Sequence, residues 1–303
     1  MKKINNVFVG TGTALATMFR SNGGIDWSAQ DRLVDLQLIG GVDFLVPCGT
    51  TGESPTLDHG EHDHVIRRVV EKVGGAVPVL AGTGSNSTKE AVRLTRAAKK
   101  FGADGALVVA PYYNKPEQEG FIRHYRKVAE VGLPIVLYDI PGRCGGQGVS
   151  AETIIKLAQE GTICGLKWAS GNLDQLQKVL DAELKDFAIL SGDDNRTVEI
   201  MEKGAHGVIS VLSNIVPVLV VSMVCDMING FPKQAREQHN RLLSLMEAMF
   251  IETNPIPVKT ALAMMHPDVF KAVFRLPLCE MGQANEKKLR EVLKKYHLLP
   301  ASK

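Results

Sequence analysis

The chain of 303 residues is poor in several features, and each scarcity excludes a class of protein. Its five cysteines are scattered and never spaced as Cys-x-x-Cys, so a disulfide framework or zinc site is not expected and reduced thiols are. Charge of one sign is not in excess: 35 basic and 33 acidic residues leave a net charge of +2. Such a balance predicts neither a nucleic-acid partner nor binding to an anionic membrane.

Long hydrophobic runs that would signal export or membrane insertion are also lacking. Lys2 and Lys3 precede an apolar stretch, but Asn5, Asn6 and Gly10 interrupt it, so a cleaved signal is not expected. From Gly204 to Cys225 there is no charged residue, yet this segment contains serine, asparagine, histidine and proline. A buried strand followed by a packed helix explains the segment better than a membrane span. We expect a cytoplasmic protein.

What the chain does contain is a regular alternation of apolar runs with amphipathic segments. It is 45% hydrophobic and 22% charged, which is typical of a globular protein. Because the apolar runs show no polar alternation, each predicts a strand of a parallel sheet buried on both faces. The predicted strands are Thr13–Thr17, Asp43–Cys48, Val77–Ala81, Gly105–Ala110, Pro134–Ile140, Ile163–Lys167, Phe187–Leu190 and Gly207–Val211.

The segments between these runs read as helices. Asp58 with Glu61, and Ser87 with Glu90, have the spacing of a capping box at a helix start. Eight strand–helix units in about 230 residues match the size of a (β/α)8 TIM barrel. The alternative is a doubly wound open sheet, whose glycine-rich first turn usually binds a nucleotide. Both Gly-Thr-Gly segments of this chain lack the third glycine, so we favour the barrel.

The strand pattern ends near residue 230. We therefore predict two parts, a catalytic barrel over residues 1–230 and an all-helical appendage over residues 231–303. The appendage is expected to contain three helices, Lys233–Thr253, Pro257–His266 and Glu286–Tyr296. Lys259 is expected to belong to a structural helix start.

Polar residues at the ends of the predicted strands are the candidates for chemistry, because functional groups of a barrel gather at that face. Lys167 closes an apolar run, so partial desolvation would lower its pKa and free the amine as a nucleophile. Tyr138 ends the preceding strand and could move protons beside that amine. The turn around Thr50 and Thr51 offers amides and hydroxyls for a carboxylate, and Arg143 could bind a second one. Taken singly, each residue also has an ordinary structural explanation.

Seven motifs taken together are more specific. In this order and at these spacings they resemble the dihydrodipicolinate synthase family, within the pyruvate-dependent class I aldolases that also include N-acetylneuraminate lyase. The resemblance runs from about Phe8 to the C-terminal helices. The motifs are GTTGES, PYYN, YDIPGR, GLKWASGN, SGDD, GVISV and NPIPVK.

The resemblance implies a role for each matching residue. Lys167 would form the Schiff base with pyruvate, and Tyr138 would relay protons with Thr51 and with Tyr113 of a neighbouring subunit. Thr50 and Thr51 match the pyruvate-carboxylate site. Two further contacts are implied, Ile209 with pyruvate and Arg143 with the carboxylate of aspartate semialdehyde. The product would be 4-hydroxy-tetrahydrodipicolinate, on the route to diaminopimelate and lysine.

The same resemblance implies assembly and regulation. A tyrosine that crosses an interface requires at least a dimer, and the family suggests a tetramer formed as a dimer of dimers. No metal or organic cofactor is needed for imine chemistry. Lysine, the pathway's end product, is expected to inhibit at a set of matching positions, which comprises Ser54, His59, Asn86, Glu90 and Tyr112.

Three residues depart from the family's usual pattern, namely Asp139, Cys144 and Trp168, where asparagine, threonine and glutamate are usual. Strand alternation points Asp139 and Trp168 away from the site. Cys144 adjoins Arg143, which leaves the identity of the second substrate open. A Pro-Gly-Arg sequence favours the synthase over a lyase for sugar acids, and another pyruvate-dependent aldolase or a catalytically silent paralogue are the remaining alternatives.

One cluster of potential metal ligands is set aside. His59, Glu61, His62 and His64 do not have the HExxH spacing and lack an evident fourth ligand, so a metal site is not expected there. A solvated helix face is one alternative, and the lysine site that the resemblance implies at His59 is the better one.

Overall fold

The apolar runs of the chain form eight parallel strands in the computed structural model, which describes residues 4–146 and 148–300. Nearly every strand residue is buried, as the absence of polar alternation predicted. Residues 1–3, which include Lys2 and Lys3, and residues 301–303 lie outside the described residues. These are the outer ends of the two predicted parts. The strands are β1 Gly10–Ala14, β2 Phe44–Val46, β3 Leu80–Gly82, β4 Gly105–Val109, β5 Ile135–Asp139, β6 Gly165–Trp168, β7 Ala188–Ser191 and β8 Gly207–Ser210.

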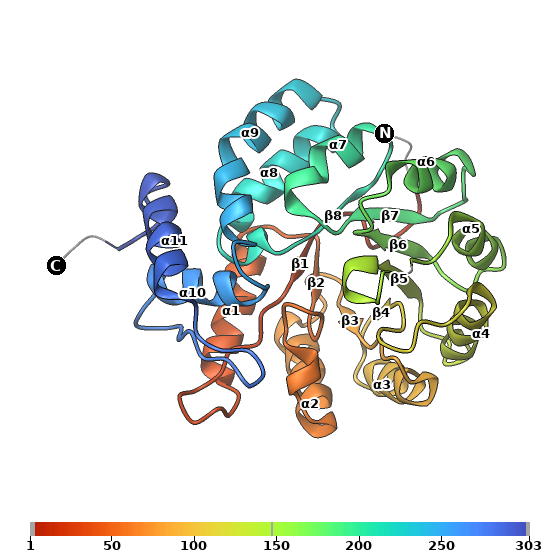
Figure 1. Ribbon diagram of the computed structural model, residues 1–303, viewed down its shortest axis with the longest axis horizontal. Coiled ribbons are helices and arrows are strands. Elements are labelled where there is room, and N and C mark those ends of the chain that lie inside the picture. The colour runs from red at the N-terminus through yellow and green to blue at the C-terminus, as the bar shows by residue number, and fades with distance from the viewer. Residues whose placement is uncertain (1–3, 147, 301–303) are drawn as a thin grey trace.

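The strands close into a ring. Hydrogen-bonded neighbours follow the order β2-β1-β8-β7-β6-β5-β4-β3. A parallel bridge between Leu45 and Val79, with the Leu45 amide donating to the Pro78 carbonyl at 3.0 Å, joins β2 to β3. The ring of strands with helices around it is visible in Figure 1. The predicted (β/α)8 TIM barrel is therefore confirmed.

A helix follows each strand and covers the outside of the ring. The uncharged segment from Gly204 to Cys225 contains β8 and most of the following helix, so the prediction of a buried strand and a packed helix is confirmed. None of the helices within the described ranges is long and apolar enough to cross a membrane. The eight helices are α1 Trp27–Ile39, α2 His59–Val73, α3 Thr88–Lys100, α4 Gln118–Ala129, α5 Ala151–Gln159, α6 Leu173–Asp181, α7 Thr197–Glu202 and α8 Pro217–Ile228.

The first strand begins earlier than predicted. We expected Thr13–Thr17, but β1 spans Gly10–Ala14. Glycine has a low strand propensity, which hid this start. The close approach of β1 to β8 nevertheless requires small residues, because a Cβ on Gly207 would lie 1.9 Å from the Gly10 carbonyl oxygen.

One predicted helix cap is confirmed and the other is wrong. Asp58 Oδ1 accepts from the Glu61 amide at 2.8 Å, and Glu61 Oε2 accepts from the Asp58 amide at 3.1 Å, which completes the capping box of α2. At α3, however, the Ser87 side chain makes no capping bond. Glu90 instead bonds to Ser85 and to His59, so its carboxylate is not available to cap the helix.

The C-terminal part contains three helices, α9 Pro232–Ala248, α10 Ile256–Met265 and α11 Gln283–Lys295. α9 packs along α7 and α8, whereas α11 packs against α9 and α10 (Figure 1). α10 also contacts a 3-10 turn, η4 Leu212–Asn214, directly after β8. Because α9 continues the helical layer of the barrel, a division between residues 230 and 231 stays a prediction.

Candidate active site

Lys167 and Tyr138 lie side by side inside the barrel. They are paired residues on β6 and β5, so both side chains point to the same face of the sheet. Tyr138 belongs to the inner core cluster, together with Ile209 of β8. The Nζ atom of Lys167 lies 4.1 Å from the centre of the Tyr138 ring, and the lysine is only 6% exposed. Two of the predicted residues are thus brought together at the strand ends.

Burial changes the acid–base properties of both groups. Desolvation lowers the pKa of Lys167 to about 8, opposed by the carboxylates of Asp193 and Asp194 and assisted by the charge of Arg143. An appreciable fraction of the amine is therefore uncharged near neutral pH. Burial also raises the pKa of Tyr138, so this phenol keeps its proton and can donate it.

A cavity of about 50 Å³ lies over these two residues, with room for a ligand of a few heavy atoms. Thr50 and Thr51, from the loop after β2, line it together with Arg143 from the 3-10 turn η2 Pro141–Arg143. Burial outweighs the opposite effect of the neighbouring Thr50 hydroxyl on the pKa of Tyr138. Thr51 Oγ1 accepts a hydrogen bond from Asn254 Nδ2 at 2.9 Å. The cavity therefore combines an amine, a phenol, two hydroxyls and a guanidinium.

Sequence reasoning missed several groups of this cavity. Gly192 and Asp193 come from the SGDD segment, and Phe250 and Asn254 come from the segment between α9 and α10. Asn254 opens the NPIPVK motif, so its presence in a family motif was the available signal. The Oδ1 atom of Asn254 is buried and has no hydrogen-bond partner within residues 4–146 and 148–300.

Tyr113 is not brought to this cavity by its own chain. It is 88% exposed and its φ of +71° lies in the left-handed region, where a bulky residue is strained. Nothing in the described fold of one chain explains a tyrosine held outward in this way.

A second, larger cavity of about 380 Å³ adjoins the first, and Thr50 and Arg143 line both. It lies between the starts of α2 and α3 and the ends of β4 and β5. Four of the five residues predicted for lysine line it, namely Ser54, His59, Glu90 and Tyr112. The fifth, Asn86, does not, although its carbonyl accepts from Asn114 Nδ2 at 2.8 Å.

The three departures from the family pattern lie behind or beside the site. Trp168 packs in the outer core and not in the barrel interior, as alternation predicted. Asp139 is buried, accepts from the Val149 amide at 3.0 Å, and has its pKa raised to about 6 by desolvation. Cys144 lines the larger cavity, and burial raises the pKa of its thiol to about 11, so it stays protonated.

The histidine-rich start of α2 is divided among different neighbours. His59 pairs with Glu90, Glu61 binds Arg275, and the His62 ring turns inward to the Gly82 carbonyl. His64 turns outward and meets Trp27 edge-on at 6.1 Å. Across the described parts of the chain, no three His, Cys, Asp or Glu side chains are grouped as metal ligands.

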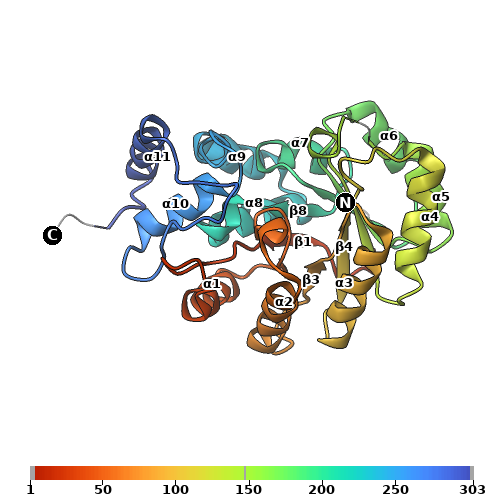
Figure 2. The same ribbon diagram turned by 60° about the horizontal axis from the view of Figure 1, so that its bottom comes forward.

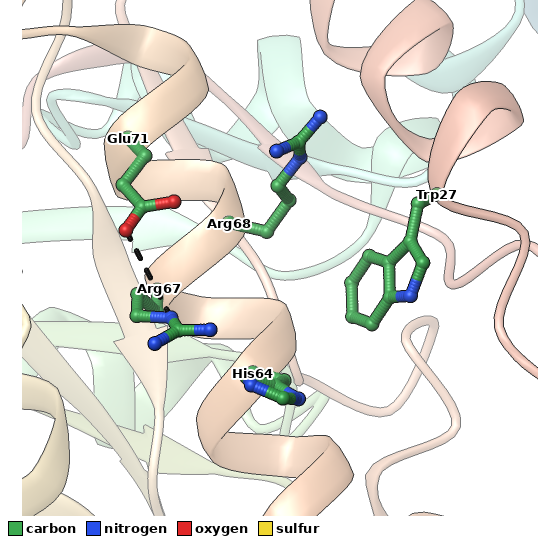
Figure 3. Close-up of a pocket in the computed structure, with 5 residues that line it drawn as sticks. All are labelled: Trp27, His64, Arg67, Arg68 and Glu71. Carbon is green, nitrogen blue, oxygen red and sulfur yellow. Dashed lines mark ion pairs between the residues drawn. The ribbon is translucent and has the colours of Figure 1, made fainter.

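His64 and Trp27 also border a groove of about 280 Å³ between α1 and α2 (Figure 3). Arg67 and Glu71 pair across one turn of α2 at 3.8 Å, and Arg68, which also lines the groove, reaches from α2 to Asp31 of α1. None of the predicted site residues lines this groove. The candidate active site is therefore the cavity over Lys167 and Tyr138 at the barrel mouth, and not this groove.

The chain is similar to known proteins along almost its whole length. The sequence model of the Dihydrodipicolinate synthetase family matches residues 7–296. A 4-hydroxy-tetrahydrodipicolinate synthase of Geotalea uraniireducens is 48% identical over 97% of this chain and 100% of its own length. The chain belongs to the Dihydrodipicolinate synthetase family. Members with that name are lyase-type enzymes.

Two solved structures of the family extend the comparison. The crystal structure of dihydrodipicolinate synthase from Aquifex aeolicus superposes with a TM-score of 0.94 at 45% identity, over 97% of this chain and 100% of that one. The enzyme from Cyanidioschyzon merolae, solved with lysine bound, gives a TM-score of 0.92 at 39% identity, over 97% and 100%.

Proposed function

We propose that this chain is a 4-hydroxy-tetrahydrodipicolinate synthase that condenses pyruvate with L-aspartate 4-semialdehyde. The proposal is carried by one observation, the buried amine of Lys167 with its pKa lowered to about 8 beside the Tyr138 ring. The name shared by full-length relatives supports the same reaction.

The first half of the reaction forms an imine. The neutral amine of Lys167 attacks C2 of pyruvate, and the carbinolamine loses water to give a protonated Schiff base. Tyr138 would supply the proton that this leaving water needs. Thr50 and Thr51 would hold the carboxylate of pyruvate through hydroxyls and turn amides, which keeps the ketone over the lysine. Ile209 would contact pyruvate from the barrel interior.

The second half forms a carbon–carbon bond. The protonated imine withdraws electrons, so the methyl group loses a proton and the enamine carbon attacks the aldehyde. The new alkoxide takes up a proton, and the amine of the second substrate then attacks the imine carbon and releases Lys167. Arg143 would bind the carboxylate of the semialdehyde, and its guanidinium suits a short anionic substrate better than a sugar chain.

Two experiments test this function. Borohydride reduction with pyruvate should add one reduced pyruvate unit to the peptide carrying Lys167. Lys259, whose pKa burial also lowers to about 8, is the internal control and should stay unmodified. Turnover with aspartate semialdehyde but not with N-acetylneuraminate would separate a synthase from a sugar-acid lyase. A chain that forms no adduct would be a silent paralogue.

We further propose a homo-oligomer, formed as a dimer of dimers, in which Tyr113 enters the partner's site and completes the relay with Tyr138 and Thr51. The outward, strained conformation of Tyr113 supports this assembly. The unpaired cysteines support residence in the reducing cytoplasm.

Lysine is proposed as a feedback inhibitor that binds in the larger cavity. Glu90 would pair with its ammonium group, and Asn86 would meet its carboxylate end. The lysine-bound relative from Cyanidioschyzon merolae supports this proposal.

A further inference from the structure

A fully buried ion pair joins the C-terminal helices to the loop that carries Thr50 and Thr51. Glu53 belongs to this loop, whereas Lys259 lies on α10, and both side chains are 0% exposed. Their charged groups are in direct contact. α10 lies beside the barrel near α8 (Figure 2), so the pair connects the appendage with the barrel mouth.

Three residues lie against the pair: Phe19, from the segment after β1, and Phe274 and Arg275, from the segment after α10. Lys259 Nζ lies 4.2 Å from the centre of the Phe19 ring and 5.0 Å from that of Phe274. The second carboxylate oxygen of Glu53 accepts from the Arg275 amide at 3.4 Å. Taking two charges out of water is costly, and apolar residues of similar volume often stabilise a fold equally well. A role in stability alone therefore does not account for this pair.

The ion pair holds Glu53 in an unusual backbone conformation. Glu53 has a φ of +52°, in the left-handed region that non-glycine residues rarely adopt. Such a conformation persists only where the surroundings fix it. The Glu53 amide donates to the Thr50 carbonyl at 3.1 Å, so this bond links the backbone at Glu53 to Thr50.

The same C-terminal region contacts the loop at two further points and the start of α2 at one. Asn254 donates from Nδ2 to Thr51 Oγ1 at 2.9 Å. Because an amide NH2 can only donate, the Thr51 oxygen must accept here, and its own proton is left to donate elsewhere. Arg275 donates to the Thr56 carbonyl, farther along the loop, at 2.8 Å. It also donates to both carboxylate oxygens of Glu61, on α2, at 2.6 Å.

We infer that Glu53, Lys259 and Asn254 are positioning residues through which the C-terminal helices set the conformation of the Thr50–Thr51 loop. The appendage is then a part of the active site and not a cover for the barrel. This inference rests on the proposed function, since it assigns these residues to the pyruvate-carboxylate site and the proton relay.

The test separates positioning from stability. The double variant Glu53→Leu with Lys259→Met removes both charges at similar volume. We expect its melting temperature to stay within a few degrees of the wild type, while kcat falls at least tenfold and KM for pyruvate rises. The adduct on Lys167 should still form at saturating pyruvate. Lys72→Met, which breaks the Asp35–Lys72 pair between α1 and α2, is the matched control and should leave kcat unchanged.

A second variant tests the inference independently, in case the double variant does not fold. Asn254→Leu removes the donor to Thr51 together with the unpartnered Oδ1. Its kcat should fall at least tenfold without a lower melting temperature. If the wild type is active and both the Asn254→Leu variant and the double variant keep its full kcat and KM, this inference is wrong, whereas the proposed function is unaffected. A wild type that forms no pyruvate adduct overturns the proposed function, and this inference with it.

Discussion

At the scale of single residues, the reactivity of this site depends on the position of Lys167 on β6, one residue before the strand ends at Trp168. The amine is buried against Tyr138, and only two aspartates oppose the loss of its charge. Desolvation outweighs both carboxylates, so the pKa falls and does not rise. A lysine one residue later would point to the outer layer, where Trp168 packs.

The first prediction concerns pH. Attack on pyruvate needs the neutral amine, whose fraction increases as pH rises toward the pKa of about 8. We expect kcat/KM for pyruvate to rise about tenfold per unit below this pH and to level off above it. Asp193→Asn should move the inflection to lower pH, because Asp193 raises the pKa of the lysine. An inflection near that of a solvated lysine would contradict the assignment.

The second prediction concerns Asp139, whose folded-state pKa of about 6 exceeds its ordinary value of 3.8. Between these values the folded chain binds more protons than the unfolded chain, so stability falls as pH rises through this window. The penalty is fully present above pH 6. Asp139→Asn should therefore raise the unfolding free energy at pH 8 by roughly 1–3 kcal/mol.

The gain should disappear near pH 4, where Asp139 itself carries a proton. Urea unfolding at the two pH values measures the difference. The exposed Asp268→Asn is the control and should show no such pH dependence. An equal gain at both pH values would mean that the carboxylate charge is not the cause.

At the scale of elements, the starts of α2 and α3 form one unit. His59 Nε2 contacts Glu90 Oε1 at 2.7 Å, and the hydrogen bond from Ser85 lowers the pKa of Glu90 below its ordinary value. The carboxylate is therefore negative at neutral pH. This unit faces the larger cavity, which shares Thr50 and Arg143 with the inner one.

The third prediction tests lysine at this unit. Millimolar lysine should inhibit the wild type and raise its melting temperature, because a ligand that binds only the folded state stabilises it. Glu90→Gln should weaken inhibition at least tenfold and leave activity without lysine within twofold. Glu130→Gln, at the end of α4, should behave as wild type. No effect of lysine on either turnover or melting temperature would rule out this regulation.

At the scale of the whole molecule, the described chain brings two of the three members of the proposed relay, Tyr138 and Thr51, to its own inner cavity. Lys167, Tyr138, Thr50 and Thr51 converge on the inner cavity, whereas Tyr113 extends into solvent. A second copy related by twofold symmetry would receive this tyrosine and return its own.

The fourth prediction follows from that exchange. Tyr113→Phe and Lys167→Ala should each be nearly inactive. When equal amounts are unfolded and reassembled together, half of the dimers are mixed and one of their two sites is intact. About a quarter of the wild-type activity should then return. No recovery in mixtures whose mixed dimers are verified by mass would exclude a tyrosine shared between subunits.

The sequence by itself determined the barrel, because runs buried on both faces fit only a sheet covered by helices. It also placed Lys167 and Tyr138 at neighbouring strand ends and assigned them by their motifs. The sequence misplaced β1, because the close approach of β1 to β8 overrides the low strand propensity of glycine. It also predicted wrongly that Glu90 caps α3, because Glu90 binds His59, 31 residues away in the sequence.

Only the tertiary structure decided which distant segments meet. The contact of Glu53 with Lys259 joins residues 206 positions apart, and that of Thr51 with Asn254 joins residues 203 positions apart. Local patterns encode neighbours along a strand or helix turn, whereas these contacts depend on how the last helices pack on the closed barrel. The pKa of Lys167 was settled in the same way, since burial is a property of the packed chain.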